Sequence, residues 1–389
     1  MIDNVNNHIH TTYSFSPYTP AMAVRMAKEH GLVTAGIMDH DSVGGLREFI
    51  EAGCAVGIAT TVGFECRASF AGTPFEGRNI NNPDQISVAY LAMHGIPHNK
   101  IDEADAFLAT YRTARNIRNR TMVEKLDKLV QPVGLTIDFD KDVVPLSRHD
   151  DGGSITERHI LYALADKIIK KIGAGPGIVA FLNDAFSVEV SGNNLEKLVN
   201  PNSDWYRYYL LGVLKGHLVN SFYIDADAEL MQVCDFIAMS ETLGAIPAYA
   251  YLGDVGDSVT GDKRTQCFED SYLDELIAFL KNAGFKAITY MPARNSYAQL
   301  ARLIELCEEH ELFQICGEDI NSPFQPFVCE ALKRDEYKHL AASAWALVGH
   351  EKAATDNGQG MFSKEIIHKY PSLDMRISHF AEIGKKVRA

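Results

Sequence analysis

The sequence predicts an α/β fold in which both ends of the chain form one sheet or barrel and a mainly helical segment interrupts it. Helical and strand patterns alternate over about the first hundred residues and again over the last third, which is typical of βαβ units and a parallel sheet. Helical patterns dominate between these two parts. The predicted domains are therefore an α/β domain of residues 1–99 and 229–389 and a helical insertion of residues 100–228.

Capping residues locate the helices near the start of the chain. Thr19 is a favourable N-cap and Pro20 suits the first helical position, so we expect a helix that ends at Gly31. Ser42 is expected to cap the next helix. The buried strands expected after these two helices are residues 33–38 and 58–63.

The last third repeats this pattern. An amphipathic helix is expected over residues 271–284, and a capping box of Ser296 and Gln299 opens the following helix. In the insertion, Ser154 and Glu157 form a second predicted capping box. The strands expected in the last third are residues 285–291 and 312–316.

Composition and charge argue against several classes of protein. No apolar run reaches the roughly 18 residues of a membrane span, and the N-terminus lacks the features of a secretory signal. The formal charge of -14 disfavours non-specific binding to nucleic acid. The seven cysteines are scattered and contain no C-x-x-C, which fits a reducing compartment. We expect a cytoplasmic protein; the sequence does not indicate its oligomeric state.

Histidines and carboxylates stand where several predicted strands end. His8 and His10 are two residues apart, so on an extended strand their rings share one face and can grip a metal ion. His40, Glu65 and Asp319 each follow an apolar run. The carboxyl ends of parallel strands meet at one edge, so we expect these side chains to converge. Taken alone, each histidine is also compatible with a surface position, and each carboxylate is also compatible with capping the next helix.

The segments NHIHTTYS, GIMDHDSVGGL, GFE and QICGEDINSP occur in the order and spacing of the motifs of the polymerase and histidinol phosphatase (PHP) domain family, which the chain resembles over roughly residues 1–330. The resemblance implies a distorted (β/α)7 barrel whose helical insertion covers the barrel mouth. It also implies a cluster of one to three divalent ions at the carboxyl-terminal face and the hydrolysis of phosphate esters.

The resemblance further implies which residues bind metal. His8, His10, Glu65 and Asp319 match all four ligands of the family's first ion. A second ion would share Glu65 and use two histidines, one of which falls on either Ala89 or His94. A third ion would use His40. The positions at which this sequence lacks a family ligand are Tyr251, Asn321 and either Phe15 or Ser16.

Arginines and one further histidine are the candidates for binding a phosphate. Arg118, Arg120 and His159 lie in the insertion, where the resemblance places cations that contact the substrate. Arg294 follows the predicted strand 285–291 and is a candidate for stabilising phosphoryl charge. For the insertion residues, a solvated helix face with i,i+4 ion pairs is the alternative explanation.

Two functions remain open at this stage. One is a hydrolase of a small phosphomonoester or phosphodiester that uses zinc, manganese or iron, with His40 or His94 assisting as a ligand or by proton transfer. The other is a catalytically silent barrel that binds a ligand or regulates a partner, which the missing family ligands favour. The nuclease role of polymerase-linked relatives is a weaker alternative, because the chain is acidic.

Overall fold

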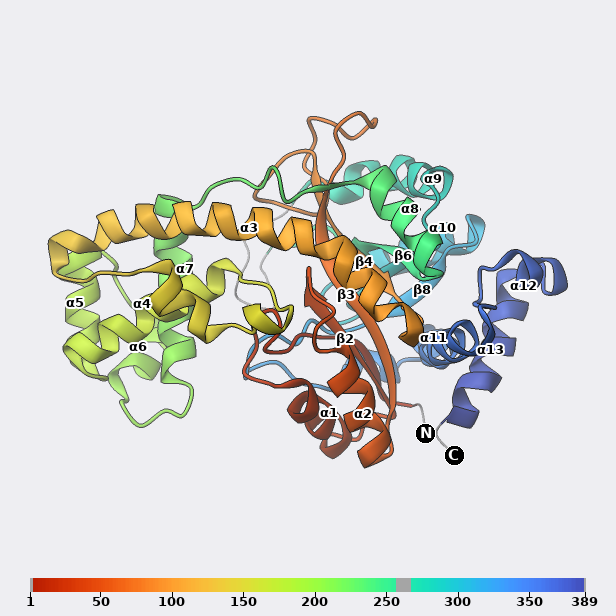
Figure 1. Cartoon of the computed structure of the whole chain (residues 1–389), viewed down its shortest axis with the longest axis horizontal. Helices are drawn as coiled ribbons and strands as arrows, with labels where there is room; N and C mark the ends of the chain where they lie inside the picture. The colour runs from red at the N-terminus through yellow and green to blue at the C-terminus, as the bar shows by residue number, and fades with distance from the viewer. Residues whose placement is uncertain (1–2, 257–266, 388–389) are drawn as a thin grey trace. The chain divides into compact units, whose positions relative to one another are not determined.

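The computed structural model describes residues 3–256 and 267–387 (Figure 1). The chain forms two compact units, which are described separately. The first comprises Met1–Tyr111 and Leu230–Ala389, and the second comprises Arg112–Glu229. The boundary between them lies inside the long helix α3 (Ile101–Val130).

The first unit contains a nearly closed, barrel-shaped sheet, so the predicted α/β barrel is confirmed. Neighbouring strands follow the order β1-β2-β3-β4-β6-β7-β8, and a short strand β5 pairs with β3 outside this path. The strands are β1 (Val5–Ile9), β2 (Thr34–His40), β3 (Ala59–Ser69), β4 (Val88–His94), β5 (Met231–Gln232), β6 (Ile246–Tyr251), β7 (Ala287–Tyr290) and β8 (Phe313–Cys316).

One strand of the barrel runs against the others, which the sequence pattern did not reveal. Strand β4 is antiparallel to both β3 and β6, whereas the remaining neighbours on the path are parallel. Its last residue, His94, therefore pairs with Gly63 and Ile246, while Glu65 pairs with Ala92. Compared with Glu65, His94 is therefore displaced by two residues, about 7 Å, toward the amino ends of the parallel strands.

Backbone and side-chain hydrogen bonds close the barrel between β1 and the segment after β8. The His10 N–H donates to the Ile320 carbonyl (2.9 Å), and the Ile320 N–H donates to the His8 carbonyl (3.1 Å). Two side-chain amides extend this seam. Asn7 donates to the Cys316 carbonyl (2.9 Å) and Asn6 donates to the Glu318 carbonyl (3.1 Å).

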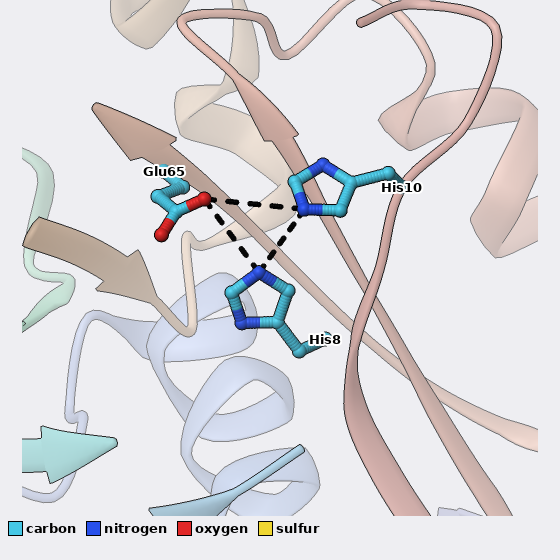
Figure 2. Close-up of side chains that lie close together, drawn as sticks. All are labelled: His8, His10 and Glu65. Atoms are coloured by element: carbon cyan, nitrogen blue, oxygen red, sulfur yellow. Dashed lines mark hydrogen bonds and ion pairs between the residues drawn. The ribbon is translucent and has the colours of Figure 1, made fainter. Parts of the chain in front are cut away.

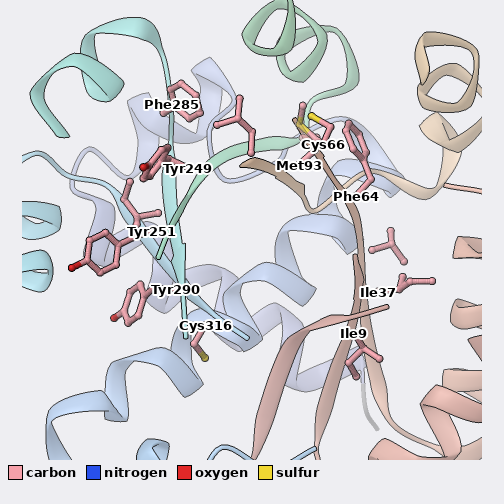
Figure 3. Close-up of a cluster of buried hydrophobic side chains, with 14 of the residues drawn as sticks. Ile9, Ile37, Phe64, Cys66, Met93, Tyr249, Tyr251, Phe285, Tyr290 and Cys316 are labelled. Carbon is pink, nitrogen blue, oxygen red and sulfur yellow. The ribbon is translucent and has the colours of Figure 1, made fainter. Parts of the chain in front are cut away.

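Helices cover the outside of the barrel through a large apolar cluster, part of which Figure 3 shows. Alternate strand residues such as Ile37, Phe64 and Tyr249 belong to this outer layer. Within the described ranges, no helix is both long and apolar enough to cross a membrane. The helices of the first unit, apart from α3, are α1 (Pro20–Glu29), α2 (Leu46–Val56), α8 (Val233–Leu243), α9 (Leu273–Ala283), α10 (Tyr297–Glu309), α11 (Lys338–Asn357), α12 (Lys364–Lys369) and α13 (Leu373–Val387).

A second apolar cluster joins the inner face of the barrel to α11 and α13. Most of its strand residues stand near the amino ends of the parallel strands, so it fills the interior on the side away from the strand ends. Gly349 and Gly384 let the two helices approach closely, because a Cβ at either position would overlap a carbonyl oxygen of the other helix. The cluster includes Met38, Ala92, Ala248, Ala287, Phe313, Trp345, Leu347 and Phe380.

Two of the predicted helix starts in the first unit are confirmed, and one is wrong. The Thr19 side chain accepts from the Met22 N–H at the start of α1. The capping box of Ser296 and Gln299 opens α10. Ser42 does not cap α2, whose N-cap is Gly45.

The second unit is helical. Its helices beyond the end of α3 are α4 (Glu157–Ile172), α5 (Pro176–Phe186), α6 (Gly192–Val199) and α7 (Tyr206–Phe222). The predicted capping box of Ser154 and Glu157 is wrong. Helix α4 begins two residues later than that box requires, with Thr156 as N-cap and His159 in the place usually taken by Glu or Gln.

Buried histidines make the fold sensitive to acid. The His350 ring on α11 accepts the Met361 N–H at Nδ1 (2.9 Å), and its Nε2 contacts the Gly95 carbonyl (3.1 Å). Protonation of Nδ1 would therefore break a buried hydrogen bond. Burial also disfavours the charged ring, so the pKa of His350 falls to about 4.

We predict that His350→Gln weakens the acid dependence of stability. With a folded pKa below the unfolded one, this histidine stabilises the fold fully above about pH 6.5 and loses that contribution as the pH falls toward 4. Between pH 7.5 and 5.0 the wild type should lose about 2 kcal/mol more than the variant. Urea unfolding of both proteins at both pH values measures this difference. Equal losses in the two proteins would contradict the prediction.

Candidate metal centre

The His8 and His10 rings meet at the end of β1. The pairing of β1 with β2 shifts from Asn6–Ala35 to Ile9–Ile37, so three residues of β1 oppose two of β2. His8 lies within this irregularity and His10 just after it, and their Nε2 atoms lie 3.2 Å apart (Figure 2). Both side chains are buried.

Glu65 on β3 lies beside this pair. Its Oε2 is 3.7 Å from His8 Nε2 and 3.9 Å from His10 Nε2. Donor atoms of these three residues all lie within 4.8 Å of one another, which is close enough to hold one metal ion. His40 ends β2 opposite Glu65, and its Nδ1 is 3.2 Å from the same carboxylate oxygen.

Asp319 reaches the cluster from the far side of the barrel seam. Its Oδ1 lies 3.2 Å from His10 Nε2 and accepts the Asn321 side-chain amide at 2.8 Å. Gly317 allows the close approach of this segment to β1, because a Cβ there would lie 2.6 Å from His8 Cβ. The structure therefore brings together His8, His10, His40, Glu65 and Asp319.

The acids and imidazoles of this buried cluster shift each other's pKa values. Burial alone would raise the pKa of Glu65, but His40, His8 and His10 lower it to about 2. For His10, burial opposes the charged ring, and the neighbouring Asp319 and Glu65 outweigh it and raise the pKa. A dense set of acids and imidazoles with perturbed pKa values is typical of a functional site.

Ser14, Thr11 and Asp39 form a hydrogen-bonded group on the Nδ1 side of the His10 ring. We did not predict this group from the sequence. Ser14 Oγ lies 3.3 Å from His10 Nδ1 and donates to Asp39 Oδ1 at 2.6 Å. Asp39 also accepts the Thr11 N–H (2.6 Å) and the Thr11 hydroxyl (2.5 Å). The signal was present, because both hydroxyl residues follow His10 within four positions in HIHTTYS.

Backbone strain marks the end of β2. Asp41 follows His40 directly, is buried, and has a φ of 49° in the left-handed region. This conformation is uncommon for residues other than glycine and often persists at functional sites. The Asp41 N–H donates to the Glu65 carbonyl at 2.8 Å, which holds the end of β2 against the middle of β3.

The His94 side chain lies on the inner face of the barrel, closer than Glu65 to the amino ends of the parallel strands. Paired residues of antiparallel strands share a face, so His94 and Glu65 face the same side of the sheet. Its Nε2 is buried and has no hydrogen-bond partner among the residues that the structure describes. Burial, with His8 nearby, lowers the pKa of His94 to about 3, so the ring is neutral and able to act as a ligand.

Arg294 lies on the loop between β7 and α10, near Asp319. Its Nε donates to the Leu252 carbonyl at 2.9 Å, and the side chain is buried. Burial lowers its pKa, whereas the charges of Glu269 and Asp319 act in the opposite direction. The loop adjoins the Asp319 segment, because the Ala293 N–H donates to Glu318.

The three candidates of the insertion belong to the second compact unit and have partners there. Arg118 Nε lies 2.6 Å from the buried carboxylate of Glu229. Arg120 forms an exposed pair with Asp140. His159 caps α4 through the Thr156 N–H, and burial lowers its pKa to about 3. Their assignment to substrate binding stays a prediction.

Other contacts engage the residues at positions where the resemblance implies ligands that this sequence lacks. The Tyr251 hydroxyl donates to Asp270 at 2.6 Å, and its ring belongs to the outer apolar cluster (Figure 3). Ala89 is a member of the same cluster. Asn321 supports Asp319 as described above. Phe15 and Ser16 are buried.

Fold and site together define an α/β barrel protein with a buried His/Glu/Asp cluster at its strand ends. No protein-family profile and no curated protein matches the sequence. A solved structure from Bifidobacterium adolescentis, described as a metal-dependent phosphoesterase, has a TM-score of 0.56 and 21% identity over 88% of this chain and 96% of that one. An amidohydrolase from Chromobacterium violaceum, solved with sulfate and no metal, has a TM-score of 0.55 and 18% identity over 87% and 96%. At these identities the likeness shows a shared fold.

We predict that His10→Ala abolishes tight binding of a divalent ion. The change removes a ring that faces both Glu65 and Asp319. Loss of a residue that only supports a ligand lowers metal affinity by at most about 100-fold. Loss of a ligand itself should lower the affinity for zinc or manganese by more than that. Competition with a coloured chelator measures it. His368→Ala, on the exposed surface of α12, is the control and should bind as the wild type does. Equal affinities in all three proteins would remove His10 from the site.

Proposed function

We propose that the chain is a metal-dependent hydrolase of a small phosphate ester. The observation that carries this proposal is the buried group of His8, His10 and Glu65 at the strand ends, joined by His40 and Asp319. In barrels of parallel strands the carboxyl ends are where active sites gather. The phosphoesterase description of one protein of the same fold supports the choice of reaction.

The donor set fits a divalent transition metal. Imidazole nitrogens and carboxylate oxygens suit zinc, manganese or iron, and the cluster contains no cysteine. The Nε2 atoms of His8 and His10 face each other at 3.2 Å beside a carboxylate, an arrangement in which one cation could bind both rings. The buried Nε2 of His94, which has no hydrogen-bond partner in the described part of the chain, could hold a further ion or a substrate atom. A bound ion would polarise a phosphoryl oxygen and lower the pKa of water.

The remaining chemistry falls to the chain's own residues. His40 is the most exposed ring of the cluster, with 28% of its side chain accessible, so it can reach a substrate and transfer a proton. Arg294 would place a guanidinium beside the Asp319 segment, where it can form hydrogen bonds to a phosphoryl group. The apolar cluster beneath the site keeps the interior dry, which strengthens these interactions.

A second candidate function is a barrel that binds a ligand without hydrolysing it. The observation in its favour is that Tyr251 and Asn321, at positions of expected family ligands, are engaged with Asp270 and Asp319. One-ion sites lack the clamp on both the attacking and the leaving oxygen. Metal content with turnover on a panel of phosphomonoesters and phosphodiesters separates the two candidates.

We predict that Glu65→Gln eliminates phosphatase turnover while the fold remains. The amide keeps the shape of the side chain but removes the negative charge that faces three histidines. Turnover of p-nitrophenyl phosphate with manganese should fall by more than about 100-fold. The matched control is Glu275→Gln, a half-exposed residue paired with Arg78. A Glu65→Gln protein with full turnover, or a metal-loaded wild type with none on any ester, would refute the hydrolase.

We predict a different result for Arg294→Met. This variant should keep its metal, because the arginine is not a ligand, but lose about 10² to 10³ in kcat/KM through lost stabilisation of phosphoryl charge. Arg302→Met on α10, which removes an exposed ion pair with Asp274, serves as the control. Comparison of kcat/KM at equal metal content measures the effect. Unchanged kinetics would exclude Arg294 from the substrate site.

A further inference from the structure

We propose that Ser14 and Asp39 are positioning residues that hold His10 in the one ring tautomer that can bind a metal ion through Nε2. The inference rests on the proposed function, since it assigns the cluster to a divalent cation. Its observations are separate, because they concern hydrogen bonds on the far side of the ring from the cluster.

The direction of each hydrogen bond follows from counting donors. The Ser14 hydroxyl has one proton and two neighbours, Asp39 Oδ1 at 2.6 Å and His10 Nδ1 at 3.3 Å. The Asp39 carboxylate can only accept, and it already receives the N–H and the hydroxyl of Thr11. The Ser14 proton therefore points to Asp39, and its oxygen accepts a proton from His10 Nδ1.

This arrangement determines which nitrogen faces the cluster. A neutral imidazole carries one N–H, so a proton on Nδ1 leaves the lone pair on Nε2. His10 Nε2 is the atom that lies 3.2 Å from His8 Nε2 and 3.2 Å from Asp319. The opposite tautomer would direct an N–H at the metal position and block coordination there.

Burial and local geometry make this support rigid. Thr11 and Ser14 are fully buried and Asp39 is 1% exposed, so water does not compete for these bonds. The Ser14 N–H donates to the Thr11 carbonyl, which closes a turn directly after β1. Asp39 precedes His40 on β2. The hydrogen bonds therefore connect the strand end that bears His10 to the one that bears His40.

Metal affinity tests the proposal without any need for turnover. Ser14→Ala should lower zinc affinity by about 10- to 100-fold, as loss of a supporting partner does. The matched control, Ser240→Ala, deletes a buried serine hydroxyl on α8 that bonds only within its own helix. It should bind zinc as the wild type does. Equal zinc affinities for Ser14→Ala and Ser240→Ala would overturn the proposal.

A second measurement locates the proton on the His10 ring directly. Long-range 1H–15N spectra of metal-free protein with labelled histidine, recorded at a pH above the raised pKa of His10, distinguish the protonated nitrogen of the neutral ring, and His10→Gln identifies the His10 signals among the 14 histidines. A proton on Nδ1 in the wild type, lost or shared in Ser14→Ala, supports the proposal. A proton on Nε2 in the wild type overturns it. Absence of phosphatase activity would refute the proposed function alone, because neither of these readouts depends on turnover.

Discussion

Closure of the barrel is the constraint on which the site depends. His8 and His10 stand on β1, and Asp319 stands beyond β8, so these groups meet only where the first and last strands of the sheet come together. Among the residues that the structure describes, the strand pairing there is one bridge between Ile9 and Ile320. Side-chain amides of Asn6 and Asn7 supply the further bonds that the short ladder lacks. An opened seam would move Asp319 away from His8 and His10.

The cluster also illustrates what burial of charge requires. Removing a carboxylate from water is costly unless other groups satisfy it, so each acid here is surrounded by donors. Glu65 has three imidazoles, and Asp39 has two hydroxyls and a backbone N–H. The two carboxylates therefore differ in what they can bind. Glu65 can exchange its contacts with imidazoles for a cation, whereas Asp39 keeps its hydrogen bonds to Thr11 and Ser14 and serves a structural role.

Local patterns in the sequence predicted a parallel sheet or barrel with His8, His10, Glu65 and Asp319 at strand ends, because strand ends and the i,i+2 spacing are properties of short segments. The closed barrel was implied by the resemblance to the PHP motifs. Long-range features were not predictable in this way. The reversed direction of β4, the irregular pairing of β1 and the amide bonds across the seam depend on partners distant in sequence. The wrong capping box at Ser154 has a local cause, since Thr156 and His159 compete for the same helix start.

Asn321 and Tyr251 stand where the resemblance to the PHP motifs implies metal ligands. Asn321 would be a weaker ligand than a histidine, but its side-chain amide donates to the Asp319 carboxylate and so orients a candidate ligand. Tyr251 is committed to Asp270 in the outer layer and contributes no donor to the cluster. The interior then holds fewer donors for second and third ions. Under the proposed function, a substrate's phosphoryl charge must be balanced by groups of the chain itself, and Arg294, buried near Asp319, is placed to do so.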